Sequence, residues 1–187
     1  YWLTFDSDDN AIELSGFKTP EDMEYSLIEG NNLVSFPADA TEYALESVLP
    51  DTLLGIVNYI IGENKSAIYD IDENVWYGSL QTLSGFSGYW MRSTVDIDFS
   101  YNFNESLTIK DDFNNQDYDL VGFEYNQSSA QAFYFIKQLP QAKIGDWIIA
   151  YHNDVIIGKR RWTGDVIDIP VMGYDGQIYS LGYIQEG

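Results

Sequence analysis

Apolar residues in this chain come in short runs, and the length of these runs limits the folds that it can adopt. The longest, such as Ala132–Ile136 and Trp147–Tyr151, are the size of β-strands. Neither approaches the roughly 20 apolar residues of a membrane-spanning helix. Aromatic residues make up 16% of the 187 residues, and aromatic side chains pack well on pleated sheets. We therefore expect a mostly β protein.

The pattern divides the chain into four segments. Residues 1–14 read as an extended N-terminal strand segment, and residues 15–24 as a linker. Residues 25–95 predict a small strand-rich α/β module with one helix. That helix begins at Asp39, an N-cap residue with Glu42 as its capping-box partner, and ends before Pro50.

The last segment, residues 96–187, predicts an immunoglobulin-like β-sandwich. It is introduced by alternating apolar residues over Val95–Phe99. Residues 152–154 (HND) sit between two apolar runs and predict a hairpin turn. A last strand is expected over Tyr179–Ile184. Short strands at this spacing, with Gly and Asn turns between them, are typical of a sandwich.

The N-terminal segment has the pattern of a strand that can leave its own molecule. Tyr1, Leu3 and Phe5 lie on one face of an extended chain, and a polar linker follows the segment. Such a strand can close its own domain, or it can enter the sheet of a neighbouring copy and form a polymer. The residues predicted to carry assembly are Tyr1, Trp2, Leu3, Phe5, Ile12 and Leu14.

Several motifs resemble two uncharacterised modules of secreted surface proteins from environmental bacteria. Residues 32–37 (NLVSFP), 76–80 (WYGSL) and 85–90 (GFSGYW) resemble the first module. The motifs that resemble the second module are residues 125–128 (YNQS), 131–136 (QAFYFI), 146–148 (DWI), 153–155 (NDV), 157–158 (IG), 170–173 (PVMG) and 175–176 (DG). Together the motifs span most of the chain, but neither module has an activity to carry over.

The resemblance implies an extracellular or cell-surface location and an extracellular fibril subunit. In the second module, the strand near Tyr183 usually continues into one more apolar strand. Residues 1–6 (YWLTFD) are similar to that continuation, so the closing strand is expected at the opposite end of this sequence. Two positions depart from the pattern: residues 151–152 (YH) replace an aromatic-Asn pair, and Ile156 stands where Cys is common.

Charge and cysteine content exclude several classes of protein. Thirty acidic residues against nine basic ones give a net charge of −21, so neither nucleic acid nor an anionic membrane is an expected partner. The chain contains no cysteine, which excludes disulfides and thiolate chemistry. The expected partner is another copy of the chain. Glycans are the alternative partner.

No cofactor is required by the sequence, although Ca²⁺ is a candidate. Asp6, Asp8 and Asn10 have the alternate spacing of oxygen ligands in a calcium loop, but the Gly and Glu of an EF-hand are missing. The same spacing recurs in residues 70–74 (DIDEN). Asp154 and Asp175, at expected hairpin tips, are further oxygen donors. Acidic loops are usually just solvated, so solvation is the simpler interpretation.

Three sequons, at Asn64, Asn104 and Asn126, are candidate glycosylation sites. Chance sequons are common in a chain rich in Asn and Ser, and many bacteria lack the attachment machinery. A glycosylated bacterial surface protein is therefore one interpretation of these sequons.

Glycan binding, as in an adhesive module of a larger surface protein, is the alternative to assembly. Aromatic side chains stack on sugar rings, although those in strands more often belong to a core. The candidates are Trp76, Tyr77, Tyr89, Trp90, Trp147 and Trp162.

Enzyme activity is not expected. His152 is the only histidine, it lies in a predicted turn, and no nucleophile motif accompanies it. No catalytic residue is therefore assigned.

Overall fold

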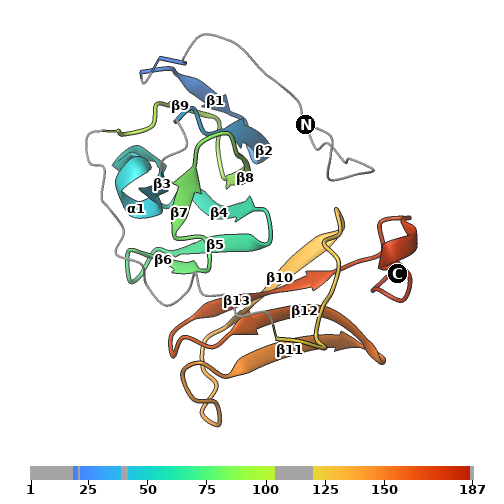
Figure 1. Cartoon of the computed structure of the whole chain (residues 1–187). Coiled ribbons are helices and arrows are strands. Elements are labelled where there is room, and N and C mark those ends of the chain that lie inside the picture. Colours follow the sequence, from blue (N-terminus) through green and yellow to red (C-terminus); the bar gives the residue numbers. More distant parts are fainter. Residues whose placement is uncertain (1–18, 21, 39–41, 104–119, 186–187) are drawn as a thin grey trace.

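The computed structural model describes residues 19–20, 22–38, 42–103 and 120–185. The predicted class is confirmed, because strands dominate the described residues and helices are few and short. The strands gather into two groups (Figure 1). We call residues 22–103 the N-terminal unit and residues 120–185 the C-terminal unit.

The N-terminal unit is built on a five-stranded antiparallel sheet with the order β2-β8-β4-β5-β6. Two small ladders, β1-β9 and β3-β7, complete it. Its strands are β1 (Tyr25–Leu27), β2 (Gly30–Ser35), β3 (Glu42–Ala44), β4 (Val57–Gly62), β5 (Lys65–Asp70), β6 (Val75–Gly78), β7 (Thr82–Ser84), β8 (Gly88–Ser93) and β9 (Ile97–Phe99).

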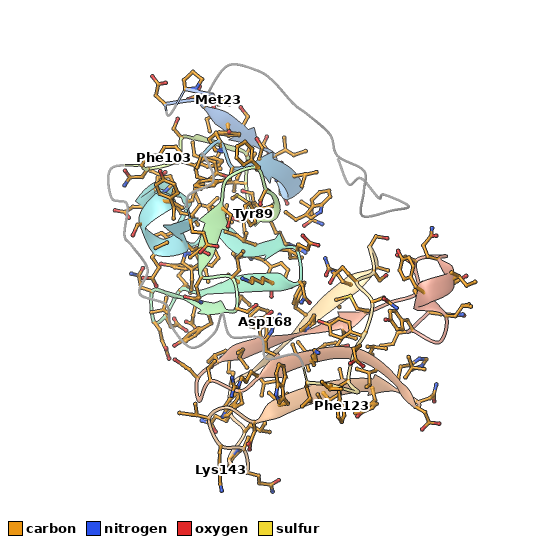
Figure 2. The ribbon with its side chains drawn as sticks, in the orientation of Figure 1. Met23, Tyr89, Phe103, Phe123, Lys143 and Asp168 are labelled. Atoms are coloured by element: carbon orange, nitrogen blue, oxygen red, sulfur yellow. The ribbon has the colours of Figure 1, made fainter. Side chains whose placement is uncertain are left out.

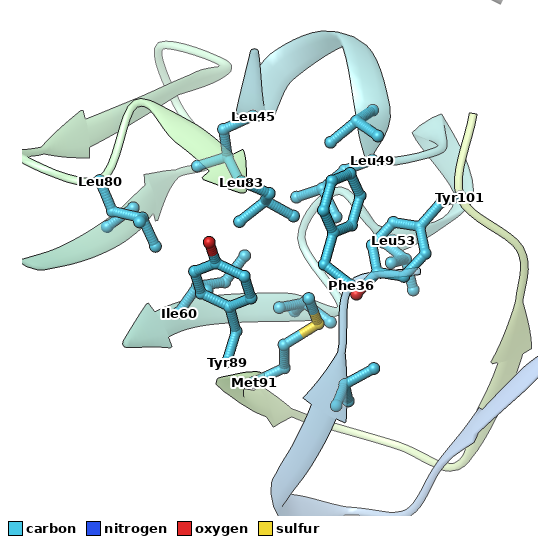
Figure 3. Packing of buried hydrophobic residues seen from close by; sticks show 14 of the residues in the cluster. Phe36, Leu45, Leu49, Leu53, Ile60, Leu80, Leu83, Tyr89, Met91 and Tyr101 are labelled. Atoms are coloured by element: carbon cyan, nitrogen blue, oxygen red, sulfur yellow. The ribbon is translucent and has the colours of Figure 1, made fainter. Parts of the chain in front are cut away.

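One face of this sheet carries a large apolar core. Along β8, buried residues alternate with exposed ones, so Tyr89 and Met91 point inward while Trp90 points outward. Figure 3 shows Tyr89 and Met91 packed with residues from β4, β7 and helix α1 (Leu45–Val48). Each large apolar side chain that is fully buried here contributes about 1.5–3 kcal/mol to the free energy of folding.

The predicted helix before Pro50 is shorter than its sequence pattern indicates. Residues 42–44 form β3, which pairs with β7, and α1 covers Leu45–Val48 alone. A side-chain cap is absent at Ala44, the residue before α1, and Asp39 lies outside the described residues. Pairing with a distant strand has overridden the local helical spacing.

The strand predicted at Val95–Phe99 belongs to the N-terminal unit and not to the sandwich. It appears as β9 and pairs with β1 in register Tyr25↔Phe99. Phe99 and Tyr101 are buried in the same core as β2 and β4. The alternation of this strand correctly predicted its conformation but could not identify its partner.

The C-terminal unit consists of two antiparallel ladders in the described residues, β10-β13 and β11-β12. The hairpin predicted at residues 152–154 is confirmed, and Asn153 adopts the positive φ of its turn. Figure 1 shows β13 and β12 between β10 and β11. The strands are β10 (Gln131–Ile136), β11 (Trp147–His152), β12 (Val155–Arg161) and β13 (Ile167–Met172).

The strand predicted at Tyr179–Ile184 is largely replaced by a 3-10 turn, η3 (Ile178–Ser180). A single parallel bridge joins Ile184 to Gly173. Asp175 organises this segment by accepting hydrogen bonds from side chains inside it, including Ser180 Oγ at 2.7 Å. A local polar network, and not a sheet partner, therefore sets the backbone here.

The two units meet across a polar seam. Asp168 on β13 is fully buried and accepts hydrogen bonds from the backbone N–H and the hydroxyl of Ser79, which follows β6. Arg160 on β12 lies 3.3 Å from the same carboxylate and donates to the carbonyl oxygen of Asn64 at 2.6 Å. Figure 2 shows Asp168 where the two ribbons approach each other. Phe135 and Tyr59 add an aromatic contact, with ring centroids 6.1 Å apart.

Candidate assembly surface

Strand β10 presents an apolar edge. Its sequence, QAFYFI, contains no charge and no proline, and its six residues pair with β13 without a register shift. All six side chains are exposed or half-buried, with Tyr134 60% exposed. Among the described strands, β10 has no partner on its other edge. Regular, apolar edges of this kind readily accept another strand.

The backbone groups on this open edge can be identified from the register. Gly173 N donates to Ala130 O, which places that pair among the hydrogen-bonded pairs of the ladder. Hydrogen-bonded and non-bonded pairs alternate, so the pair of Phe133 with Pro170, which has no N–H, is non-bonded. Phe133 and Phe135 therefore direct their N–H and C=O groups toward the open edge.

In the β10-β13 ladder, β13 is covered on the side away from β10, where it crosses β12. Arg160 Nε donates to Asp168 O at 3.0 Å. A Cβ atom on Gly158 of β12 would lie 1.7 Å from Pro170 O, so glycine is required for this close crossing. Because β12 occupies that side of β13, β10 is the side of the ladder on which a strand can add.

The other outer strand, β11, is less suited to strand addition. Its pairing with β12 shifts register between Ala150 and Tyr151, where Ile157 of β12 is the extra, unpaired residue. A bulge increases the local twist of the strand pair, so regular pairing of a new strand along β11 is disfavoured. The regular edge of β10 lacks this protection.

The core of the C-terminal unit is small in the described residues. Ile157, Val171, Met172 and Tyr183 form its buried apolar cluster, whereas the N-terminal unit buries many more apolar residues. The apolar side chains of β10 and β11 remain half-exposed or exposed. An added strand would bury part of this surface, and burial of apolar area is the main source of affinity in such pairing.

The residues predicted to donate that strand lie outside the described residues. This holds for Tyr1, Trp2, Leu3, Phe5, Ile12 and Leu14, and for the calcium candidates Asp6, Asp8 and Asn10. Their roles therefore stay predictions.

The second acidic repeat forms the turn between β5 and β6. Asp70 Oδ1 accepts from the backbone N–H of Asp72 at 3.0 Å, and Asn74 has a positive φ and accepts from the Tyr69 hydroxyl. The Glu73 carboxylate accepts from Tyr77 and raises the pKa of that phenol to about 12. No cluster of three or more acidic or histidine side chains suited to a metal occurs among the described residues.

Asp175 is the most heavily hydrogen-bonded carboxylate of the described loops. Ser180 Oγ is its strongest donor, and donors on Ser129, Gln177 and Tyr179 add to it. These bonds favour the ionised form and hold the pKa of Asp175 well below its usual range. The carboxylate is thus already engaged in fixing the loop.

The three sequons have different surroundings. Asn64 is half-buried at the seam, where its side-chain oxygen accepts from the Tyr125 hydroxyl at 2.9 Å. Asn126 is exposed, and its backbone is held by Tyr183. Asn104 lies outside the described residues. Asn126 is therefore the more accessible of the two described sequons.

The aromatic residues predicted as sugar-stacking candidates do not form one platform. Trp76, Tyr89 and Trp162 are buried, so they serve the cores. Trp147 is half-buried under Lys159, whose Nζ lies 5.6 Å from the ring centroid. Trp90 is exposed. Phe86, which is not among the predicted residues, is far more exposed, and its place in the glycine-rich GFSG loop is the sequence signal that marks it.

The single histidine holds a loop. His152 Nδ1 donates to Gly182 O at 2.9 Å, and Asn153 Nδ2 lies 3.5 Å from Nε2. No serine or carboxylate of the described residues hydrogen-bonds to this ring.

The chain matches no protein-family model, no curated protein and no solved structure. Among the described residues, no helix has the length and apolar character needed to span a membrane.

Proposed function

We propose that this protein is the structural subunit of an extracellular filament, in which residues 1–14 of one copy add as a strand to β10 of the next. The observation that carries this proposal is the apolar edge of β10, which no described strand covers. An edge of six regular residues without charge, proline or bulge is a hazard to a protein unless a strand covers it.

The N-terminal segment has the chemistry of a suitable strand. Tyr1, Leu3 and Phe5 alternate with Trp2 and Thr4, so one strand presents apolar side chains to both faces of a sheet. Backbone pairing with Phe133 and Phe135 would supply ladder hydrogen bonds. Burial of each large apolar side chain would add about 1.5–3 kcal/mol to the free energy of association.

Donation between copies produces an open chain of subunits. The donor segment and the acceptor edge are different surfaces, so each copy can accept one strand and give one. Such head-to-tail contacts continue indefinitely unless the rotation between copies closes a ring. The large negative charge favours solubility and opposes non-specific lateral association.

The first test is removal of the donor. Full-length protein should form filaments in negative-stain electron micrographs, and a variant lacking residues 1–14 should elute as a monomer in size-exclusion chromatography. A synthetic peptide of residues 1–14 should bind this truncated variant and leave it monomeric. Filaments that persist without residues 1–14, or a full-length protein that stays monomeric, would contradict the proposal.

The second test places a charge on the acceptor. Tyr134→Lys introduces an ammonium group at an exposed position of β10 and should prevent polymerisation, because a charged edge disfavours strand addition. Tyr151→Lys is the matched control, since Tyr151 is 52% exposed on β11. If Tyr151→Lys blocks filaments and Tyr134→Lys does not, β11 is the acceptor and the assignment to β10 is wrong.

A further inference from the structure

A groove on the N-terminal unit lies apart from the assembly edge. It has a volume of about 710 Å³ and runs between the end of β2, the β4–β5 turn and the loop that joins β7 to β8. Its floor includes the buried side chains of Phe36, Leu80 and Tyr89, which Figure 3 shows in the core. Its volume is within the range of small-ligand sites.

Phe86, on the wall of this groove, combines strain with exposure. Four described non-glycine residues have a positive φ; three are Asn residues, which tolerate that region, and the fourth is Phe86 with φ 61°. Its side chain is 89% exposed, so the ring gains little from packing. A strained backbone without a packing benefit suggests a functional constraint.

The loop that carries Phe86 is anchored on both sides. Ser87 O accepts a hydrogen bond from Phe36 N at 3.0 Å, and Tyr89 OH accepts one from Ser84 N at 2.8 Å. These bonds tie the loop to β2 and β8, so the Phe86 ring is presented from a fixed base. A loop backbone that is already ordered reduces the conformational entropy lost when the ring binds a ligand.

The groove walls are polar and balanced in charge. Ser35, Thr82 and Ser87 contribute hydroxyl groups that make no hydrogen bond to another described residue. Glu63 and Lys65 add one charge of each sign. Hydroxyl groups with no net charge suit an uncharged ligand rich in hydroxyl groups, and the overall charge of −21 disfavours anions.

We infer that this groove binds a neutral sugar chain, with the face of one sugar ring stacked on Phe86 and the sugar hydroxyls bonded to the groove walls. Leu33, which lines the groove, pairs across the sheet with Trp90, and both are exposed. They continue the apolar surface beyond the groove, which suits a chain of several sugars. This binding does not depend on assembly.

Isothermal titration calorimetry of the full chain with cellohexaose, maltohexaose and mannohexaose tests the inference. At least one hexasaccharide should bind with Kd below about 1 mM. Phe86→Ala and Phe86→Gly should weaken that binding about fivefold, as expected for loss of one stacked ring. Val121→Ala, which removes a side chain of matching exposure outside the groove, should bind like the wild type.

Two further measurements show whether a variant has lost sugar binding and not its fold, and whether the groove hydroxyls contact the sugar. Phe86→Gly should raise the melting temperature while it weakens binding, because glycine adopts a positive φ without strain. Thr82→Val keeps the side-chain shape but removes a wall hydroxyl, so it should also weaken sugar binding. Absence of binding to all three hexasaccharides, or unchanged binding by Phe86→Ala, would overturn the inference.

Discussion

At the scale of single residues, the described loops are held by side chains that replace missing sheet partners. Asp175 shows this most clearly, since its carboxylate collects donors from both sides of its loop. The sequence identified Asp175 as a loop oxygen donor and a candidate for calcium. The structure gives it protein donors, which sequence spacing cannot reveal because Ser129 lies far away along the chain.

Stability should depend on pH through Asp175. Its pKa is lowered in the folded state, so the ionised carboxylate stabilises the fold above the unfolded value of about 4, and this contribution is lost as the pH falls further. Asp175→Asn should therefore flatten the dependence of the urea midpoint on pH between about pH 5 and pH 2. Asp154→Asn, at an exposed hairpin tip, is the control and should preserve the wild-type slope.

For the helices and strands, the backbone conformation of a segment was predicted better than the strand with which it pairs. The alternation in β9, the apolar run of β10 and the turn around Asn153 reflect local backbone geometry, and the sequence was a sufficient guide to them. The placement of β9 in the sandwich and the helix expected over residues 42–44 were wrong, because both depend on pairing with distant segments. The seam around Asp168 was not predicted at all.

The close crossing of β12 over β13 predicts that a side chain at Gly158 destabilises the protein. Gly158→Ala would place a methyl group on Pro170 O, a backbone atom that cannot rotate away. We expect the free energy of unfolding to fall by about 3 kcal/mol or more, measured by urea denaturation. Gly122→Ala is the control for alanine substitution, since a Cβ there meets open space, although its φ of 88° adds strain of its own. Equal losses in the two variants would show that the crossing is not tight.

At the scale of the whole molecule, the seam determines how the two units behave together. Asp168 and Arg160 form a buried ion pair that also bonds to Ser79 and Asn64 of the other unit. Removing one partner of such a pair leaves the other charge without compensation in a poorly solvated site. The seam is therefore expected to couple unfolding of the two units.

Asp168→Asn tests this coupling. The variant should lose about 3 kcal/mol of unfolding free energy, because Arg160 keeps its charge while its buried partner becomes neutral. Differential scanning calorimetry should show the transition of the full chain broadened or divided into two. Asp154→Asn, an exposed acid in the same unit, should change stability by less than about 0.5 kcal/mol. A loss for Asp168→Asn no larger than that of Asp154→Asn would argue against the seam as the link between the units.

The mostly β class, the strand length and several of the turns could be predicted from the sequence, because they follow from side-chain alternation and from the backbone preferences of Gly and Asn. Tertiary contacts decide which strands pair, that β10 has one partner among the described strands, and that Asp168 lies buried between two units. It also placed an exposed, strained Phe86 beside a polar groove. These features depend on contacts between residues far apart in the chain, and no local pattern encodes the free energy of such contacts.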